Sequence, residues 1–170
     1  FEHEYDLKEL KKELTNHVGK IKGLLVTGGE PCFQRSALIE LLKNTKELKL
    51  KTAIDTNGSK PSVIEKLLKD NLIDKIIIDL KAPFNELFEK ITKSATFFKS
   101  SKDIMQDVKE TLQILKAYDE TVEIIFRTTI IPSMLFRKED LMMMAQEIKD
   151  INCLWELKAF SPNIVYDKRM

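Results

Sequence analysis

Four short polar segments of the sequence carry residue types that could bind a small charged molecule. Residues 27–31 read TGGEP, residues 55–58 read DTNG, residues 79–81 read DLK and residues 127–129 read RTT. A carboxylate accepts hydrogen bonds from an amino group, and an arginine can donate two to a carboxylate. Glycine leaves the backbone open to a ligand. The segments therefore predict a pocket for a small zwitterionic ligand, with both signs of charge in its wall.

Each polar segment follows a short apolar run that we expect to be a strand. The expected strands cover residues 23–27, 50–55, 75–79, 122–131 and 153–160. Amphipathic helical stretches alternate with them in units of roughly 25 to 30 residues, which predicts parallel strands joined and covered by helices. In such folds ligands bind at the carboxyl ends of the strands. We therefore expect all four segments at one rim of the sheet.

The helices between these strands carry recognisable start signals. The chain is expected to have five main helices with a helix first, and a short extra helix within residues 83–101. Pro61 suits the first turn of a helix that buries a cluster of aliphatic residues, namely Val63, Ile64, Leu67 and Leu68. Ser100 and Asp103 have the spacing of a capping box. On the last helix, expected over 138–150, Met142, Met143 and Met144 are interpreted as core residues.

Composition limits the classes of function. The 170 residues fit a single domain, 1–170, and its 28 basic and 27 acidic residues leave a net charge of +1. That balance gives no electrostatic reason to expect nucleic acid or a membrane as partner. The two cysteines, Cys32 and Cys153, are far apart, so we interpret them as small packing residues in a protein of the reducing cytoplasm.

Each polar segment also has a simpler structural interpretation. Gly28 and Gly29 could form only a tight turn, and residues 55–58 could cap a helix. Asp79 and Lys81 could be an ion pair, and Arg127 could pair with Glu123, which alternation places on the same face of its strand. The occurrence of all four segments at strand ends favours a ligand site over four unrelated features.

The ordered series VTGGEP, DTNG, DLKAP and FRTT, at residues 26–31, 55–58, 79–83 and 126–129, resembles the motifs of radical S-adenosylmethionine (SAM) enzymes. The similarity runs from about residue 6 to residue 160. Within that superfamily it is greatest to the activating proteins of anaerobic ribonucleotide reductases and to their pyruvate formate-lyase activase relatives. The resemblance implies a partial (β/α) TIM-like barrel with a mostly parallel sheet.

The resemblance also implies the cofactors and their contacts. In the family a reduced [4Fe–4S] cluster cleaves SAM to methionine and a 5′-deoxyadenosyl radical, which removes a hydrogen atom from the substrate. The implied SAM contacts are Gly28, Gly29, Glu30, Asp55, Thr56, Asp79, Lys81 and Arg127. Of these, Gly28, Gly29 and Glu30 would meet the methionine amino group, and Arg127 the methionine carboxylate. In activase relatives, residues like Asp55, Thr56 and Asp79 help to form a cation site.

One family motif is not found in this sequence. The family holds its cluster with three cysteines spaced CxxxCxxC, and no such triplet is present. Because the first helix matches the helix that comes after the cluster loop in the family, we expect that one strand and this loop lie upstream. The domain would then be truncated at its N-terminus, and the 170 residues alone would be inactive.

The substrate stays open at this point. If the subgroup is right, the substrate is a glycine in a partner protein, which becomes a glycyl radical, and an external electron donor reduces the cluster. One alternative is a radical SAM enzyme that acts on a small molecule or nucleobase, and another is a SAM-binding domain without catalysis. A third, an aldolase-like barrel that forms a Schiff base on Lys81, leaves residues 28–31 and Arg127 without a role.

Overall fold

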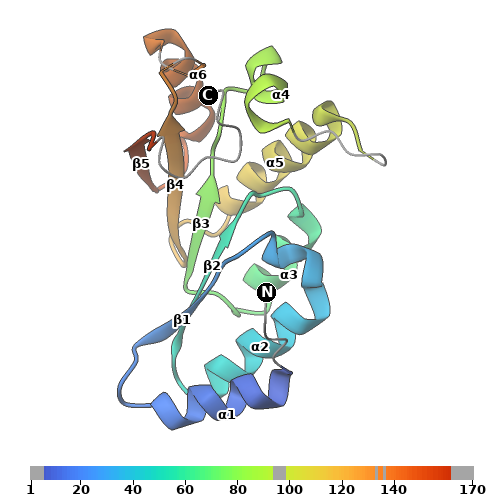
Figure 1. The fold of residues 1–170 in the computed structure, drawn as a ribbon, viewed down its shortest axis with the longest axis vertical. Helices are drawn as coiled ribbons and strands as arrows, with labels where there is room; N and C mark the ends of the chain where they lie inside the picture. Colours follow the sequence, from blue (N-terminus) through green and yellow to red (C-terminus); the bar gives the residue numbers. More distant parts are fainter. Residues whose placement is uncertain (1–5, 94–98, 133, 136, 162–170) are drawn as a thin grey trace.

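The predicted α/β fold with a parallel sheet is confirmed. The computed structural model describes residues 6–93, 99–132, 134–135 and 137–161. Within these residues five strands form one sheet in the order β1-β2-β3-β4-β5, and each strand pairs in parallel with the next (Figure 1). The strands are β1 (Gly23–Val26), β2 (Lys51–Thr56), β3 (Lys75–Asp79), β4 (Glu123–Ile130) and β5 (Leu154–Ala159).

The helices occur in the predicted order, with a helix first. They are α1 (Leu7–His17), α2 (Arg35–Glu47), α3 (Pro61–Lys69), α4 (Glu86–Thr92), α5 (Ser101–Lys116) and α6 (Lys138–Ile148), and a 3-10 turn, η1 (Pro31–Gln34), precedes α2. Helix α4 is the short extra helix that the long connection after β3 predicts. Each pair of successive strands is joined by a crossover that contains at least one helix, and strands that are neighbours in sequence are adjacent in the sheet.

The start signals in the sequence act as predicted. Pro61 occupies the first position of α3, and the four aliphatic residues predicted on that helix are all buried. At α5 the Asp103 N–H donates to Ser100 Oγ at 3.2 Å, and the Ser100 N–H donates to Asp103 Oδ2 at 3.0 Å. These bonds satisfy amides that a helix N-terminus leaves without a partner in the helix.

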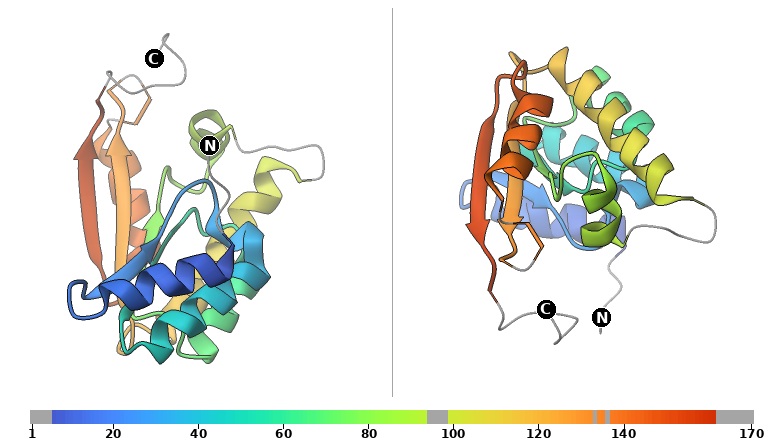
Figure 2. Two further views of the ribbon diagram at one scale, coloured as in Figure 1. Left: turned by 60° about the horizontal axis from the view of Figure 1, so that its bottom comes forward. Right: turned by 90° about the horizontal axis from the view of Figure 1, so that it is seen from above.

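The two faces of the sheet have different surroundings. Along β2 the buried residues Thr52 and Ile54 alternate with more exposed ones, and the buried face packs against helices. Seen from above, the helices lie to one side of β4 and β5 (Figure 2). The other face is largely open, because Leu25 and Leu154 are 47% and 56% exposed. The prediction that helices cover the strands is therefore correct for one face only, as in an incomplete barrel whose inner face is open.

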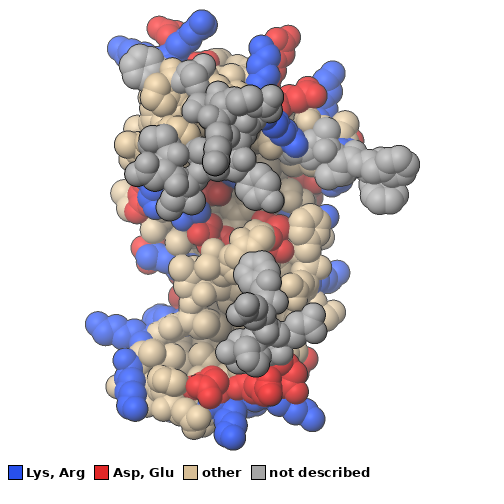
Figure 3. All heavy atoms as spheres, viewed as in Figure 1, with Lys and Arg blue, Asp and Glu red and all other residues tan. Residues whose placement is uncertain are grey.

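The surface otherwise mixes both signs of charge. In Figure 3 basic and acidic side chains are interspersed, mainly around the rim of the face shown. Among the described residues no helix is both long and apolar enough to cross a membrane. On α6, Met144 is fully buried, whereas Met142 and Met143 are 60% and 43% exposed, so the core interpretation is right for Met144 alone.

Candidate functional site

Three charged residues from three neighbouring strands meet at the carboxyl edge of the open face. Asp79 at the end of β3 lies opposite Arg127 of β4 in the strand register. Asp55 of β2 lies opposite Ile77, two residues before Asp79, so alternation puts both carboxylates on the same face. Arg127 Nε and Nη2 donate to Asp79 Oδ1 at 2.9 and 2.7 Å, and Nη2 also donates to Asp55 Oδ1 at 2.8 Å.

The three side chains are largely shielded from water, with 23%, 15% and 29% exposed for Arg127, Asp55 and Asp79. Partial burial by itself lowers the pKa of Arg127, but hydrogen bonds and charge from Asp79 and Asp55 outweigh it and raise that pKa. The guanidinium therefore stays charged. The group of Asp55, Asp79 and Arg127 therefore presents both signs of charge to a ligand.

Two of the simpler interpretations can now be compared with the structure. Lys81 Nζ lies 3.8 Å from Asp79 Oδ2, so the predicted ion pair forms and brings Lys81 to the same rim. Arg127 does not pair with Glu123, which instead contacts Lys75 Nζ at 2.8 Å. The register decides this, because Glu123 lies opposite Lys75, at the far end of the β3–β4 ladder from Arg127.

Glu30 joins the ends of β1 and β2. Its Oε1 accepts hydrogen bonds from Thr56 Oγ1 at 2.7 Å and from the Cys32 N–H at 3.1 Å, and its Oε2 accepts from the Asn57 N–H at 2.8 Å. Thr56 is buried, next to Asp55 along the strand, and faces the helices. The structure thus brings Asp55, Asp79, Lys81 and Arg127 together, whereas the hydroxyl of Thr56 lies on the opposite face.

The glycine pair before Glu30 forms an open turn. Gly28 has φ +126°, a conformation that side chains rarely adopt, and a Cβ built on Gly28 or Gly29 would meet no atom within 4 Å. The turn therefore combines the predicted tight bend with a backbone that a ligand could approach. Gly29 and Glu30 line a cavity of about 270 Å³ beside α1.

Neither cysteine has the properties of an exposed thiolate. Cys32 is 2% exposed, and burial, with the charge of Glu30 next, raises its pKa to about 12. Burial and then the charge of Asp119 raise the pKa of Cys153. Within the described residues no three histidine, cysteine or acidic side chains are placed to hold a metal ion.

Two cavities adjoin the charged group. One of about 480 Å³ is lined by Asp79, Lys81, Arg127 and Thr129 together with residues of α4 and β5. The other, of about 270 Å³, lies toward α4 and α5 and shares Asp79 and Lys81 with the first. Asp79 and Lys81 thus lie between the two cavities. A ligand in either cavity would contact these two charged side chains.

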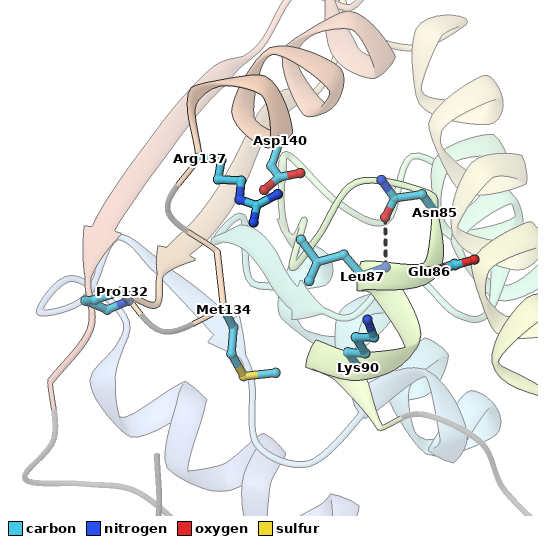
Figure 4. A pocket seen from close by; sticks show the side chains of 8 residues that line it. All are labelled: Asn85, Glu86, Leu87, Lys90, Pro132, Met134, Arg137 and Asp140. Carbon is cyan, nitrogen blue, oxygen red and sulfur yellow. Dashed lines mark hydrogen bonds between the residues drawn. The ribbon is translucent and has the colours of Figure 1, made fainter.

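A larger cavity, of about 710 Å³, lies between α4 and the start of α6 (Figure 4). Leu87, Met134 and Pro132 provide apolar wall, and the polar wall consists of Asn85 and four charged side chains: Glu86, Lys90, Arg137 and Asp140. None of the residues predicted to bind SAM lines it. Size alone therefore does not point to the predicted SAM-binding residues, several of which line the smaller cavities.

The sequence did not predict the hydrogen bonds that connect β5, β4 and the end of β3. The Trp155 Nε1–H of β5 donates to Thr128 Oγ1 at 2.9 Å, and the Thr128 hydroxyl donates to the Leu80 carbonyl at 2.6 Å. This relay crosses β5, β4 and the end of β3 directly behind Asp79 and Lys81. Thr128 lay within a motif, but no sequence signal connected it to Trp155.

Comparison with known proteins places this geometry in a family. A family model described as a 4Fe-4S single cluster domain matches residues 1–106. A Methanocaldococcus jannaschii protein named "Putative glycyl-radical enzyme activating enzyme" is 32% identical over 145 residues, which are 85% of this chain and 57% of that protein. The pyruvate formate-lyase-activating enzyme of Clostridium pasteurianum is 31% identical over 130 residues, 76% of this chain and 49% of that enzyme. The chain thus spans about half the length of these relatives.

Solved structures agree on the fold. A structure of TYW1 with a lysine–pyruvate adduct bound superimposes with a TM-score of 0.63 at 22% identity and covers 91% of this chain and 52% of that one. An archaeal TYW1 superimposes with a TM-score of 0.58 at 21% identity, and the match covers 85% of this chain and 50% of the TYW1 chain. The chain belongs to the 4Fe-4S single cluster domain family of the radical SAM superfamily, and it is related to the glycyl-radical activating enzymes.

Proposed function

We propose that this chain is the SAM-binding part of a glycyl-radical activating enzyme. The observation that carries the proposal is the convergence of Asp55, Asp79, Lys81 and Arg127 at the carboxyl edge of a parallel sheet. That edge is where α/β folds bind ligands. The two curated relatives support the reaction class, because both are named as activating enzymes.

Arg127 is the proposed partner of the methionine carboxylate. Its Nε and Nη2 are used by Asp79 and Asp55, and no hydrogen bond to a described residue uses Nη1. A carboxylate could therefore bind at Nη1 without breaking the group, and Lys81 could provide a second positive charge. The two aspartates would hold the guanidinium in one orientation, which lowers the entropy lost when the ligand binds.

The amino end of SAM is proposed to lie at the turn of residues 28–30. Backbone carbonyl groups are acceptors for an ammonium group, and the open space beside Gly28 and Gly29 would let such a group approach. Glu30 already accepts three hydrogen bonds from its own chain, so its contribution is mainly to hold this turn against β2. A metal cation between Asp55 and Asp79 would require Arg127 to move, and the Thr56 hydroxyl, on the opposite face of β2, could not be one of its ligands.

The residues of this chain do not fit an iron–sulfur cluster. Three cysteine thiolates are the family's ligand set, whereas the 170 residues contain two cysteines, of which Cys32 is buried with a raised pKa. Ligands for a cluster would have to come from outside this sequence. A cluster held by such ligands would supply the electron for radical chemistry on SAM. This chain would bind and orient the SAM.

The test uses the full-length protein, reconstituted with iron and sulfide under anaerobic conditions. With dithionite as electron donor, we expect SAM to be converted to methionine and 5′-deoxyadenosine, measured by liquid chromatography. With the anaerobic ribonucleotide reductase of the same organism added, we expect the electron paramagnetic resonance signal of a glycyl radical. SAM cleavage without that signal would favour a small-molecule substrate, and the absence of cleavage would contradict the proposal.

A further inference from the structure

A small apolar pocket lies directly beside the proposed SAM site. Its volume is about 270 Å³, and its walls come from the end of β3, the turn after β2, and helices α4 and α5. The apolar wall consists of Leu80, Phe88, Ile104 and Val108, of which Leu80, Phe88 and Val108 are no more than 5% exposed. Three of these four wall residues thus belong to the buried core, and Ile104 is partly buried against it.

The mouth of this pocket carries an exposed aromatic ring. Phe33 is 67% exposed, the largest exposed fraction among the large apolar residues of the described chain, and it lines the pocket. Lys60 Nζ lies 4.5 Å from the centre of its ring, a cation–π contact that holds the ring at the surface. A large exposed apolar group beside an apolar pocket is typical of a surface that binds a partner.

The pocket adjoins the proposed SAM site. Asp79 and Lys81 line both this pocket and the 480 Å³ cavity that contains Arg127. A group bound in the pocket would therefore lie next to the SAM site. Pockets for whole small molecules have volumes of about 300–1,000 Å³, so the size here suits a single side chain better.

We propose that this pocket receives an apolar side chain from the partner-protein loop that carries the reacting residue. The inference rests on the proposed function, in which the substrate is part of a protein. One buried apolar anchor surrounded by a rim that excludes water is how protein interfaces commonly obtain most of their affinity. Here Phe88, Ile104 and Val108 would surround the anchor, and Phe33 would close over it. The pocket would then select the partner and place its loop beside the radical.

The experiment uses the full-length reconstituted protein, with the anaerobic ribonucleotide reductase of the same organism as the probe. Ile104→Trp fills the pocket from the α5 side, and Phe33→Ser removes the ring at its mouth. Met142→Ser, at a residue 60% exposed on α6, is the matched control for loss of an exposed apolar side chain. For each protein we measure the KM for the reductase from initial rates of glycyl-radical formation, and the KM for SAM from 5′-deoxyadenosine release without reductase.

We expect both pocket variants to raise the KM for the reductase by roughly tenfold or more, as loss of a buried anchor does, and to leave the KM for SAM unchanged. Met142→Ser should behave like wild type. Phe33→Ser changes a surface residue, so the test does not depend on the folding of Ile104→Trp. An unchanged KM for the reductase in Phe33→Ser would overturn the inference. So would a raised KM for SAM, which would place the adenine base in the pocket.

The wild-type protein separates this inference from the function on which it rests. If wild type cleaves SAM but forms no glycyl radical on the reductase, the proposed partner is wrong and the inference is overturned with it. If wild type forms the radical and the pocket variants match it, the proposed function survives and only the inference is overturned.

Discussion

At the scale of single residues, Glu30 determines how the end of β1 meets the end of β2. Its carboxylate accepts from Cys32, Thr56 and Asn57, which belong to two segments more than twenty residues apart in sequence. A carboxylate is suited to this position because it is a pure acceptor with two oxygens. Glu30 therefore acts as a clamp that fixes the glycine turn relative to Asp55.

Glu30→Gln should destabilise the protein. The amide nitrogen of glutamine is a donor, so one N–H or O–H of the clamp would face another donor. We expect the free energy of unfolding to fall by roughly 1–3 kcal/mol, the cost of leaving a partly buried polar group unsatisfied. Urea denaturation followed by circular dichroism measures it. Glu40→Gln, at an exposed position on α2, is the control, and an equal effect of the two substitutions would contradict the clamp.

Residue types and positions together made most of the charged group predictable. Asp55, Asp79 and Arg127 each stand at the end of an apolar run, and parallel strands bring such ends to one edge. Their mutual pairing was not predictable, because the partner of Arg127 depends on the register between strands. The sequence offered Glu123 on the same strand, whereas the register places Asp79 beside Arg127.

At the scale of elements, β3 is anchored at both ends. Near its start Asp74 accepts from Lys46 Nζ at 2.7 Å, Lys51 Nζ at 3.0 Å and the Thr52 N–H at 2.8 Å. Burial alone would raise the pKa of Asp74, but these hydrogen bonds outweigh it and hold that pKa well below the ordinary value. The contacts tie β3 to α2 and β2 at the edge of the sheet opposite the site.

The lowered pKa of Asp74 predicts a pH-dependent contribution to stability. A carboxylate with a lowered folded-state pKa stabilises the protein above its unfolded value, about 3.9, and loses this effect as the pH falls toward the folded value. Asp74→Asn should therefore reduce the free energy of unfolding by roughly 1–3 kcal/mol at pH 7. The difference from wild type should shrink below a pH of about 4. Urea titrations at several pH values test this, and a difference independent of pH would contradict it.

The other end of β3 is held by the relay from Trp155 through Thr128 to the Leu80 carbonyl. Thr128→Val keeps the shape of the side chain but leaves the indole N–H and the carbonyl without this partner. We expect a loss of roughly 1–3 kcal/mol in unfolding free energy, with a change in the emission of Trp155, the single tryptophan of the sequence. Thr128→Ser keeps the hydroxyl and should retain the wild-type emission. If Thr128→Val also retains it, the relay has no such role.

The order and type of the elements followed from local sequence, whereas these anchors did not. Apolar runs, Pro61 and the capping box at Ser100 act within a few residues, so a single sequence reveals them. Asp74 and Trp155 bind residues more than twenty positions away, to which no local pattern points.

At the scale of the whole molecule, the sheet is an arc with helices on its outer face. Leu25 and Leu154 are exposed on the inner face, where a complete barrel would enclose them. The sequence predicted strands covered by helices, and a continuous apolar run does not distinguish a face that packs against helices from the lining of a barrel. The open face also explains why the charged rim is accessible from the inner side.

The 170 residues alone should not cleave SAM. The chain has two cysteines, fewer than the three thiolates of the family's cluster site, and Cys32 is buried. After reconstitution with iron and sulfide, and with dithionite present, we expect no 5′-deoxyadenosine above the level without protein. The full-length protein treated in the same way is the control. Turnover by the isolated chain would refute the idea that its cluster ligands lie elsewhere.

The central claim is that the ends of β2, β3 and β4 bind SAM through Arg127 and the aspartates that hold it. Equilibrium dialysis of labelled SAM against the full-length protein tests this claim most directly. The test variant is Arg127→Lys, and the control is Arg137→Ala, at a residue that lines the separate cavity near α6. A lysine keeps the charge but lacks the fork that binds both carboxylates and ligand, so we expect SAM affinity to fall about tenfold or more. Arg137→Ala should bind like wild type. Equal binding by Arg127→Lys and wild type would contradict the account.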